Sequence, residues 1–362
     1  MPPIPVSLLI LAYRLILSYR LILSYILIFA HRLIQKKNTD TMLSRVANSI
    51  YWLGRYLERA ENYARLVEVN FNLMMDLPPG LKEQWEPVVR ITGDLDSYAA
   101  RYDGFDQKQV IYYMTFDPEN PNAITSAITS ARENARGIRE NLTKETWEYL
   151  NDLYLYMTQR YEHKDWLLDD PREMFESLRK RILLIYGLAF NTGARTESWY
   201  FRQMGMYLER ADKTSRFLDM KYHLLLPSPD MVGNPLDVLQ WSALLKSVSG
   251  YNAYRRLYGA VEPINVVEFL VLSRSFSRSI FYCLKEAENC LNMISGNLDS
   301  GFKNPAEKAL GGLRSRLEYA DVRDVINDGL HEYLDDLQLQ LNRVSDHINV
   351  TYFQLGRWEG SD

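Results

Sequence analysis

The stretch from Gly54 to Ala60 reads GRYLERA, and the stretch from Gly205 to Ala211 reads GMYLERA. The two copies are 151 positions apart, and at the same offset Arg65 aligns with Arg216. A repeat of this length marks a duplicated structural unit and has to be recognised before the fold is assigned. The doubled motif therefore predicts two homologous halves.

The alignment of the halves continues downstream at an offset of 156. Trp85 then meets Trp241, and Ile124 meets Ile280. The five-residue change falls in proline-rich turns, where insertions are tolerated. No Gly/Ser/Pro-rich linker separates the halves, so we expect one fused domain over residues 42–362, with halves at about 42–190 and 191–355.

Helical spacing surrounds both copies of the motif. Between Met42 and Asp76 there is no proline, and apolar residues recur every three or four positions until Pro78. Long strand-like alternation is absent from the sequence. We therefore predict an all-α fold, a large helical bundle of two pseudo-symmetric halves. The expected helices span residues 42–76, 81–101, 123–142, 144–163, 179–226, 236–258, 264–272, 278–294, 305–319 and 322–353.

The first 41 residues differ from the rest of the chain. They contain the hexapeptide YRLILS twice in tandem, and their apolar run from Leu21 to Ala30 is shorter than the roughly 20 residues that a membrane helix needs. Extending that run takes in Arg20 and Arg14, which are costly at bilayer depth. We interpret residues 1–41 as an extension outside the domain, with Met42 as the start of the fold and no stable membrane span. A membrane-associating helix is the alternative.

Charge and cysteine content narrow the class of protein. The net charge is -4, and the first 41 residues carry five basic side chains against Asp40, so the remainder is at -8. An acidic body argues against a nucleic-acid partner, which needs a basic face. Cys283 and Cys290 lie two helical turns apart, about 10 Å, which is too far for a disulfide, so a cytoplasmic location is expected. Neither these thiols nor the scattered histidines form a ligand set, and we expect neither a metal nor a cofactor.

The doubled Glu-Arg pair is the main candidate site. It consists of Glu58 with Arg59 and Glu209 with Arg210, accompanied at helical spacing by Arg65 and Arg216. One interpretation is a buried ion pair that locks helices together, since the planar guanidinium pairs bidentately with carboxylates. The second is a polar pocket that binds a carboxylate or phosphate, and the third is a solvated helix face.

Two further arginine clusters are candidates for anion binding. Arg132 and Arg136 share a helix face, where weak surface pairs with Glu133 and Glu140 are the simpler interpretation.

Arg274 and Arg278 flank Ser275 and Ser277 at an expected helix start. Either serine could cap that helix, and a helix N-terminus beside arginine favours anions.

Known catalytic sequence signatures are missing. The sequence has no nucleophile elbow, no phosphate-binding loop and no dinucleotide fingerprint. The abundant tyrosine and tryptophan residues occur at helical spacing and are more typical of core packing than of a ligand cage. We therefore favour a non-catalytic protein.

Several segments together resemble the bacterial alpha-E domain family, which is named for its helices and its Glu-Arg motif. Residues 42–66, 130–142, 199–219 and 247–258 carry the resemblance, and residues 1–41 lie outside it. Ser277 departs from the family pattern, where proline is expected before Arg278.

The resemblance implies a partner class and not a reaction. Members of the family occur beside, or fused to, circularly permuted ATP-grasp proteins and transglutaminase-like peptidases. This implies a helical accessory or binding protein in a system that makes and trims amide bonds or a peptide tag. The alternatives are an enzyme that uses Glu58 and Glu209 on an anionic substrate, and a purely structural bundle that forms a homo-oligomer.

Overall fold

The computed structural model describes residues 42–76, 84–168, 170–223, 233–297, 299 and 301–354, so the interpretation of residues 1–41 lies outside the described part. Every regular element in these ranges is helical, which confirms the all-α prediction. Within the same ranges, no helix combines the length and the apolar character that crossing a bilayer requires.

The helices follow one another with short connections. In chain order they are α2 (Ser44–Met75), α3 (Glu86–Arg90), α4 (Leu95–Ala99), α5 (Gln107–Thr115), α6 (Ile124–Gly137), α7 (Lys144–Glu162), α8 (Arg172–Thr192), α9 (Glu197–His223), α10 (Pro235–Ser247), α11 (Tyr251–Tyr258), α12 (Pro263–Val271), α13 (Ile280–Ser295), α14 (Pro305–Glu318), α15 (Val322–Asn327) and α16 (Leu330–Ile348). Two 3₁₀ turns, Arg139–Asn141 and Asp165–Leu167, precede α7 and α8, and a π-helical turn, Asn349–Phe353, follows α16.

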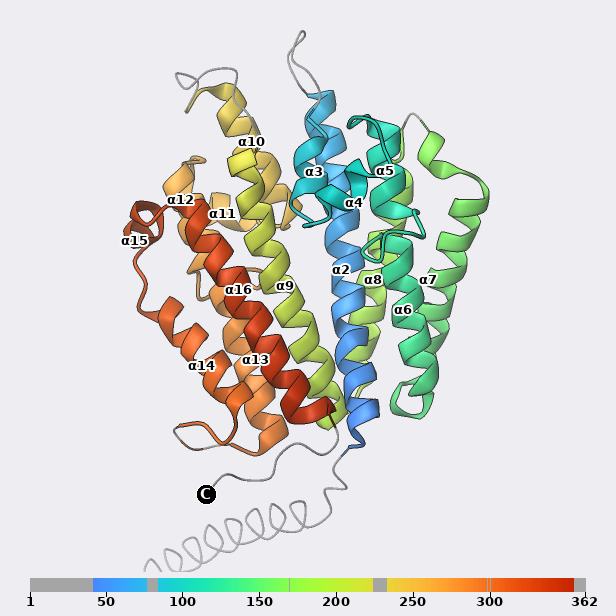
Figure 1. The fold of residues 1–362 in the computed structure, drawn as a ribbon, viewed down its shortest axis with the longest axis vertical. Coiled ribbons are helices and arrows are strands. Elements are labelled where there is room, and N and C mark those ends of the chain that lie inside the picture. Colours follow the sequence, from blue (N-terminus) through green and yellow to red (C-terminus); the bar gives the residue numbers. More distant parts are fainter. Residues whose placement is uncertain are drawn as a thin grey trace, which may run out of the picture. The chain divides into compact units, whose positions relative to one another are not determined.

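Two long parallel helices, α2 and α9, form the centre of the helical body (Figure 1). They touch backbone to backbone at two glycines. A Cβ on Gly54 would lie 2.2 Å from the carbonyl oxygen of Arg202, and a Cβ on Gly205 would lie 2.2 Å from that of Tyr51. Any side chain at either glycine would push the helices apart, so the first residue of each GxYLERA motif permits the close approach.

The remaining helices flank this pair on two sides. Helices α6 and α8 pack against α2, and α7 covers them (Figure 1). Helices α13 and α16 pack against α9, and α14 covers them. Because both faces of the α2–α9 pair are covered, the carboxylates of Glu58 and Glu209 are held away from water.

Helix starts follow ordinary capping chemistry. Asp106 accepts hydrogen bonds from the first turn of α5, and Thr143 does the same for α7. Asn234 caps α10, which has proline in its first turn. Helix α13 is capped by Ser279, whose hydroxyl accepts from the Tyr282 amide, so the prediction of a cap at Ser275 or Ser277 was wrong.

Several expected helices are divided by residues with positive φ. The range 81–101 holds α3 and α4, separated near Gly93 (φ 80°), and 322–353 holds α15 and α16, separated at Gly329 (φ 89°). The range 236–258 breaks at Ser249 (φ 55°), a conformation that serine seldom adopts. The range 179–226 contains parts of two helices, α8 and α9, with residues 193–196 between them. Helix α5 (Gln107–Thr115) was not predicted from the sequence.

Two aromatic clusters include residues of α4 and α11. Tyr98 stacks on Tyr102 with 4.8 Å between ring centroids. Tyr254 stacks on Tyr258 at 5.0 Å, with Phe269 edge-on to both rings. Tyr98 and Tyr254 are fully buried, as core-packing aromatic residues are.

Candidate functional site

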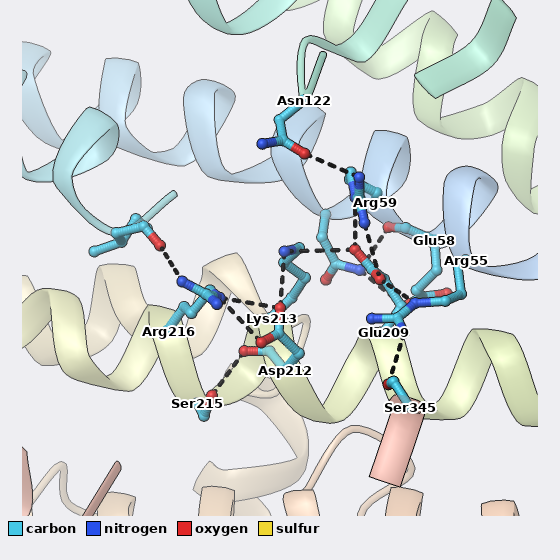
Figure 2. Close-up of polar contacts among 12 residues, drawn as sticks. Arg55, Glu58, Arg59, Asn122, Glu209, Asp212, Lys213, Ser215, Arg216 and Ser345 are labelled. Carbon is cyan, nitrogen blue, oxygen red and sulfur yellow. Dashed lines mark hydrogen bonds and ion pairs between the residues drawn. The ribbon is translucent and has the colours of Figure 1, made fainter. Parts of the chain in front are cut away.

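The two Glu-Arg motifs exchange partners across the α2–α9 interface. Arg210 on α9 donates two hydrogen bonds to Glu58 on α2, at 2.8 and 2.9 Å. In return, Arg59 on α2 donates two to Glu209 on α9, at 2.8 and 3.3 Å. Figure 2 shows the Arg59–Glu209 half of this exchange. Each carboxylate is fully buried and each pair is bidentate, the strong geometry for this interaction.

Glu58 accepts hydrogen bonds from four residues on four different segments of the chain. Besides Arg210, it accepts from Arg278 just before α13 at 3.0 Å, from Asn62 one turn along α2 at 2.9 Å, and from Tyr186 on α8 at 3.1 Å. Both carboxylate oxygens are thereby occupied by donors of the chain itself. The carboxylate joins α2, α8, α9 and α13.

Glu209 is surrounded in the same manner by cations. Arg55 donates to its Oε2 at 2.7 Å, and the Lys213 Nζ lies 3.4 Å from its Oε1. The two arginines that reach it are in turn held by neutral groups: Arg55 donates to Ser345 on α16 at 3.0 Å, and Arg59 donates to Asn122 before α6 at 2.9 Å (Figure 2).

A second acid follows each motif and extends the network. Glu61 accepts from Arg65 and, at 2.9 Å, from Arg278. Asp212 accepts from Lys213 at 2.8 Å and from Arg216 at 3.0 Å (Figure 2).

The cations keep these carboxylates ionised. Burial by itself would raise the pKa of Glu58, but the guanidinium groups of Arg210 and Arg278 lower it to about 2. Burial by itself would also raise the pKa of Glu209. Arg59, Lys213 and Arg55 outweigh this effect and hold the pKa well below its ordinary value. The pKa of Asp212 is lowered as well, against the effect of burial, by Lys213 and an arginine. None of these carboxylates would carry a proton near neutral pH.

Positive charge exceeds negative charge in the network. Burial, together with the nearby Arg278 and Arg179, lowers the pKa of Arg65 to about 9. Burial also lowers the pKa of Arg278, and Arg210 adds to that effect. The Nε atom of Arg65 is buried without an acceptor. Seven cationic side chains share four carboxylates here: Arg55, Arg59, Arg65, Arg210, Lys213, Arg216 and Arg278 with Glu58, Glu61, Glu209 and Asp212.

The other predicted arginines lie apart from this network. Arg132 donates to Asn151 at 2.9 Å and to Glu133 at 2.9 Å, and Arg136 pairs with the same Glu133 at the surface. Arg274 is exposed and lies 3.4 Å from Glu318. The structure therefore separates Arg274 from Arg278, four positions later, which lies inside the bundle.

Some members of the network were not singled out from the sequence. Glu61 and Asp212 follow YLERA directly, at the offset of 151, so the repeat itself contained the signal for them. Tyr186, Asn122 and Ser345 lie on segments remote from either motif, and nothing in their local sequence indicates the contact.

One group outside the network offers oxygen and nitrogen ligands together. The His331 Nδ1 lies 2.7 Å from Asp219, and its Nε2 lies 3.7 Å from Asp335. Three such ligand atoms within 4.8 Å of one another have the spacing of a cation site. The hydrogen bond to Asp219 raises the pKa of His331, which suits an ion-pair role for the ring. The expectation that the chain binds no metal remains a prediction.

Comparison with known proteins identifies a family that the sequence matches. Residues 42–353 match the Alpha-E family, described as a predicted alpha-helical domain with a conserved ER motif. An uncharacterized protein of Mycobacterium bovis and one of Mycobacterium tuberculosis strain CDC 1551 are each 24% identical to this chain over 345 residues. Another from strain H37Rv is 23% identical. The matches cover 86% of this chain but 37% of each relative, so the chain spans less than two fifths of their length. No solved structure matches it.

Proposed function

The chain belongs to the Alpha-E family, and we propose that it is a non-catalytic helical accessory or binding protein whose two ER motifs hold its central helices together. The observation that carries this proposal is the exchange of partners. The carboxylate oxygens of Glu58 and Glu209 accept hydrogen bonds from arginines of the opposite helix, Arg210 and Arg59, and no carboxylate oxygen is left for a substrate.

The rival function is an enzyme in which Glu58 and Glu209 act as acid or base. A general acid needs a proton at working pH, and a good general base has a pKa near that pH. Cations lower the pKa of Glu58 to about 2 against the opposing effect of burial, and they hold that of Glu209 well below its ordinary value. These values disfavour both roles and fit a permanent buried ion pair.

We also propose that the two halves arose by duplication of one unit. The reciprocal contacts support it: Gly54 approaches Arg202 as Gly205 approaches Tyr51, and these pairs are related by the offset of 151. The offset of 156 relates the stacked pair Tyr98 and Tyr102 to Tyr254 and Tyr258. In each cluster the first tyrosine donates from its hydroxyl to a backbone carbonyl six positions on, at 3.0 Å.

The accessory role implies a second protein or domain. More than three fifths of each mycobacterial relative lies outside the matched region. We propose that this chain acts together with a second protein or domain, and the family resemblance favours a circularly permuted ATP-grasp ligase or a transglutaminase-like peptidase. A homo-oligomer without such a partner is the simpler alternative.

Affinity co-purification tests the partner. The whole chain would be tagged and expressed with an ATP-grasp protein and a transglutaminase-like protein from the same genome. We expect a stable complex at micromolar concentration. The absence of any complex, together with a defined homo-oligomer in light scattering, would favour the structural alternative.

The enzymatic rival requires a separate test. Glu209→Gln should reduce the stability of the fold and leave the activity of any assembled complex intact at a temperature where the variant is folded. Loss of turnover in a fully stable Glu209→Gln protein would instead support the enzyme.

A further inference from the structure

A cavity of about 370 Å³ lies where the end of α8 meets the start of α9. The turn before α7 closes another side of it. Its volume is within the range of small-molecule sites. The polar part of its lining consists chiefly of Asn141, Thr143, Thr146, Thr196, Ser198 and Arg202.

Arg202 differs from the arginines of the central network because it lacks a carboxylate partner among the described residues. Its Nη2 lies 3.4 Å from the carbonyl oxygen of Ala189, near the end of α8. A guanidinium has five N–H donors, so this single long hydrogen bond leaves most of them free. Burial, with a smaller effect from Arg195, lowers the pKa of Arg202 to about 10. A partly desolvated cation thus borders the cavity without an ion pair to any described carboxylate.

Two helix N-termini border the same cavity, each with a glutamate, Glu145 or Glu197, in its first turn. Helix α7 begins just after Thr143, and α9 begins at Glu197. The amide groups of a first helical turn have no intrahelical acceptor, and the helix dipole is positive at that end. Thr146 and Ser198, both in first turns, line the cavity. The acidic Glu140 also lines it, but its side chain is exposed and does not pair with Arg202.

We propose that this cavity binds a small ligand through a carboxylate or phosphate group, with Arg202 as the principal contact. The hydroxyl groups of Thr143 and Thr146 lie 2.8 Å apart and share one hydrogen bond, so one of them, together with the hydroxyl of Ser198, would supply further donors. This site is separate from the ER network, where every carboxylate is already paired, and the proposal does not depend on the accessory role.

Isothermal titration of the whole chain with inorganic phosphate, and separately with glutamate, tests the proposal. We expect saturable binding of at least one of them, and the stronger one identifies the anion class. Arg202→Gln should weaken that binding about tenfold to a hundredfold, the range for loss of a hydrogen bond to a charged group. Arg195→Gln is the matched control, because it removes the same charge from a residue that does not line the cavity and only stacks on the lining residue Trp199.

Thermal unfolding without added anion distinguishes a binding residue from a structural one. If Arg202 serves the ligand, Arg202→Gln should melt at or above the wild-type temperature, because it removes an uncompensated cation. Phosphate or glutamate should then raise the melting temperature of the wild type and of Arg195→Gln only. Two results would overturn the proposal. One is binding that Arg202→Gln leaves unchanged. The other is no binding of either anion to the wild type at 10 mM, a concentration on the order of a hundredfold above a 0.1 mM dissociation constant.

Discussion

Replacing Glu58 by Gln removes one charge from the centre of the network while keeping the shape of the side chain. Glu58 is fully buried and accepts hydrogen bonds from Arg210, Arg278, Asn62 and Tyr186. The variant leaves two buried guanidinium groups short of negative charge, a loss that costs about 3–5 kcal/mol in comparable buried pairs. The pKa gives a similar magnitude, because the difference between its ordinary 4.5 and about 2 corresponds to about 3 kcal/mol. We therefore expect Glu58→Gln to lower the free energy of unfolding by about 3–5 kcal/mol.

Urea unfolding at pH 7, followed by far-ultraviolet circular dichroism, measures this loss. Glu133→Gln is the control, since Glu133 pairs with Arg132 and Arg136 at the surface and is 42% exposed. Such pairs contribute less than about 1 kcal/mol. If Glu58→Gln unfolds within about 1 kcal/mol of the wild type with an unchanged denaturant slope, the network does not hold the helices together and the reasoning fails.

Three further changes test other parts of the structure. In the same unfolding assay, Gly54→Ala should destabilise the fold by at least about 1–3 kcal/mol, because its Cβ would meet the facing helix. Gly187→Ala is the control, because a Cβ there meets nothing within 4 Å, and it should be neutral or stabilising by up to about 1 kcal/mol. Equal effects of the two substitutions would contradict the close approach of the helices. Because the pKa of Glu58 is lowered in the folded state, its contribution to the free energy of unfolding is present above about pH 4.5 and is lost as the pH falls towards 2. Unfolding curves of the wild type should therefore show a loss of stability between these pH values, and Glu58→Gln should show a smaller loss. An identical loss in both proteins would show that Glu58 is not responsible. Burial raises the pKa of Cys283 to about 12, and burial together with the nearby Glu286 raises that of Cys290 to about 12. Ellman's reagent should therefore label both thiols in urea and neither in the folded chain. Fast labelling under native conditions would contradict their burial.

The sequence was sufficient for the helical class and for singling out the doubled motif as a candidate site. Apolar spacing and the prolines after Asp76 located α2, and the lock interpretation of the Glu-Arg pair agrees with the observed contacts. What it could not supply was the direction of pairing. Glu58 and Arg59 are adjacent and point from the helix at angles about 100° apart, and in the structure they pair with Arg210 and Glu209 of the other helix and not with each other. Each needs a partner on another helix, and only the fold identifies it.

The divided helices and the isolated arginines have a different cause. Gly93 and Gly329 interrupt apolar patterns that remain in register on both sides, so periodicity alone extends one helix through both. In the expected anion row, Arg132 contacts Asn151 and two aromatic rings of α7, whereas Arg136 pairs with Glu133 at the surface. Arg202 carried no sequence signal, since its distinguishing property is the missing carboxylate, which depends on the packing of three helices.

The exchange of partners between α2 and α9 also bears on the order of events during synthesis. Glu58 lies 152 positions before Arg210 and 220 before Arg278. At about 5–20 residues per second, Glu58 is made roughly 8–30 s before the first of these guanidinium groups. Until then Glu58 lacks the arginines of other segments that accompany it into the core. Closure of the α2–α9 pair is therefore a late, long-range step, and the nascent chain keeps its longest helix open for most of translation.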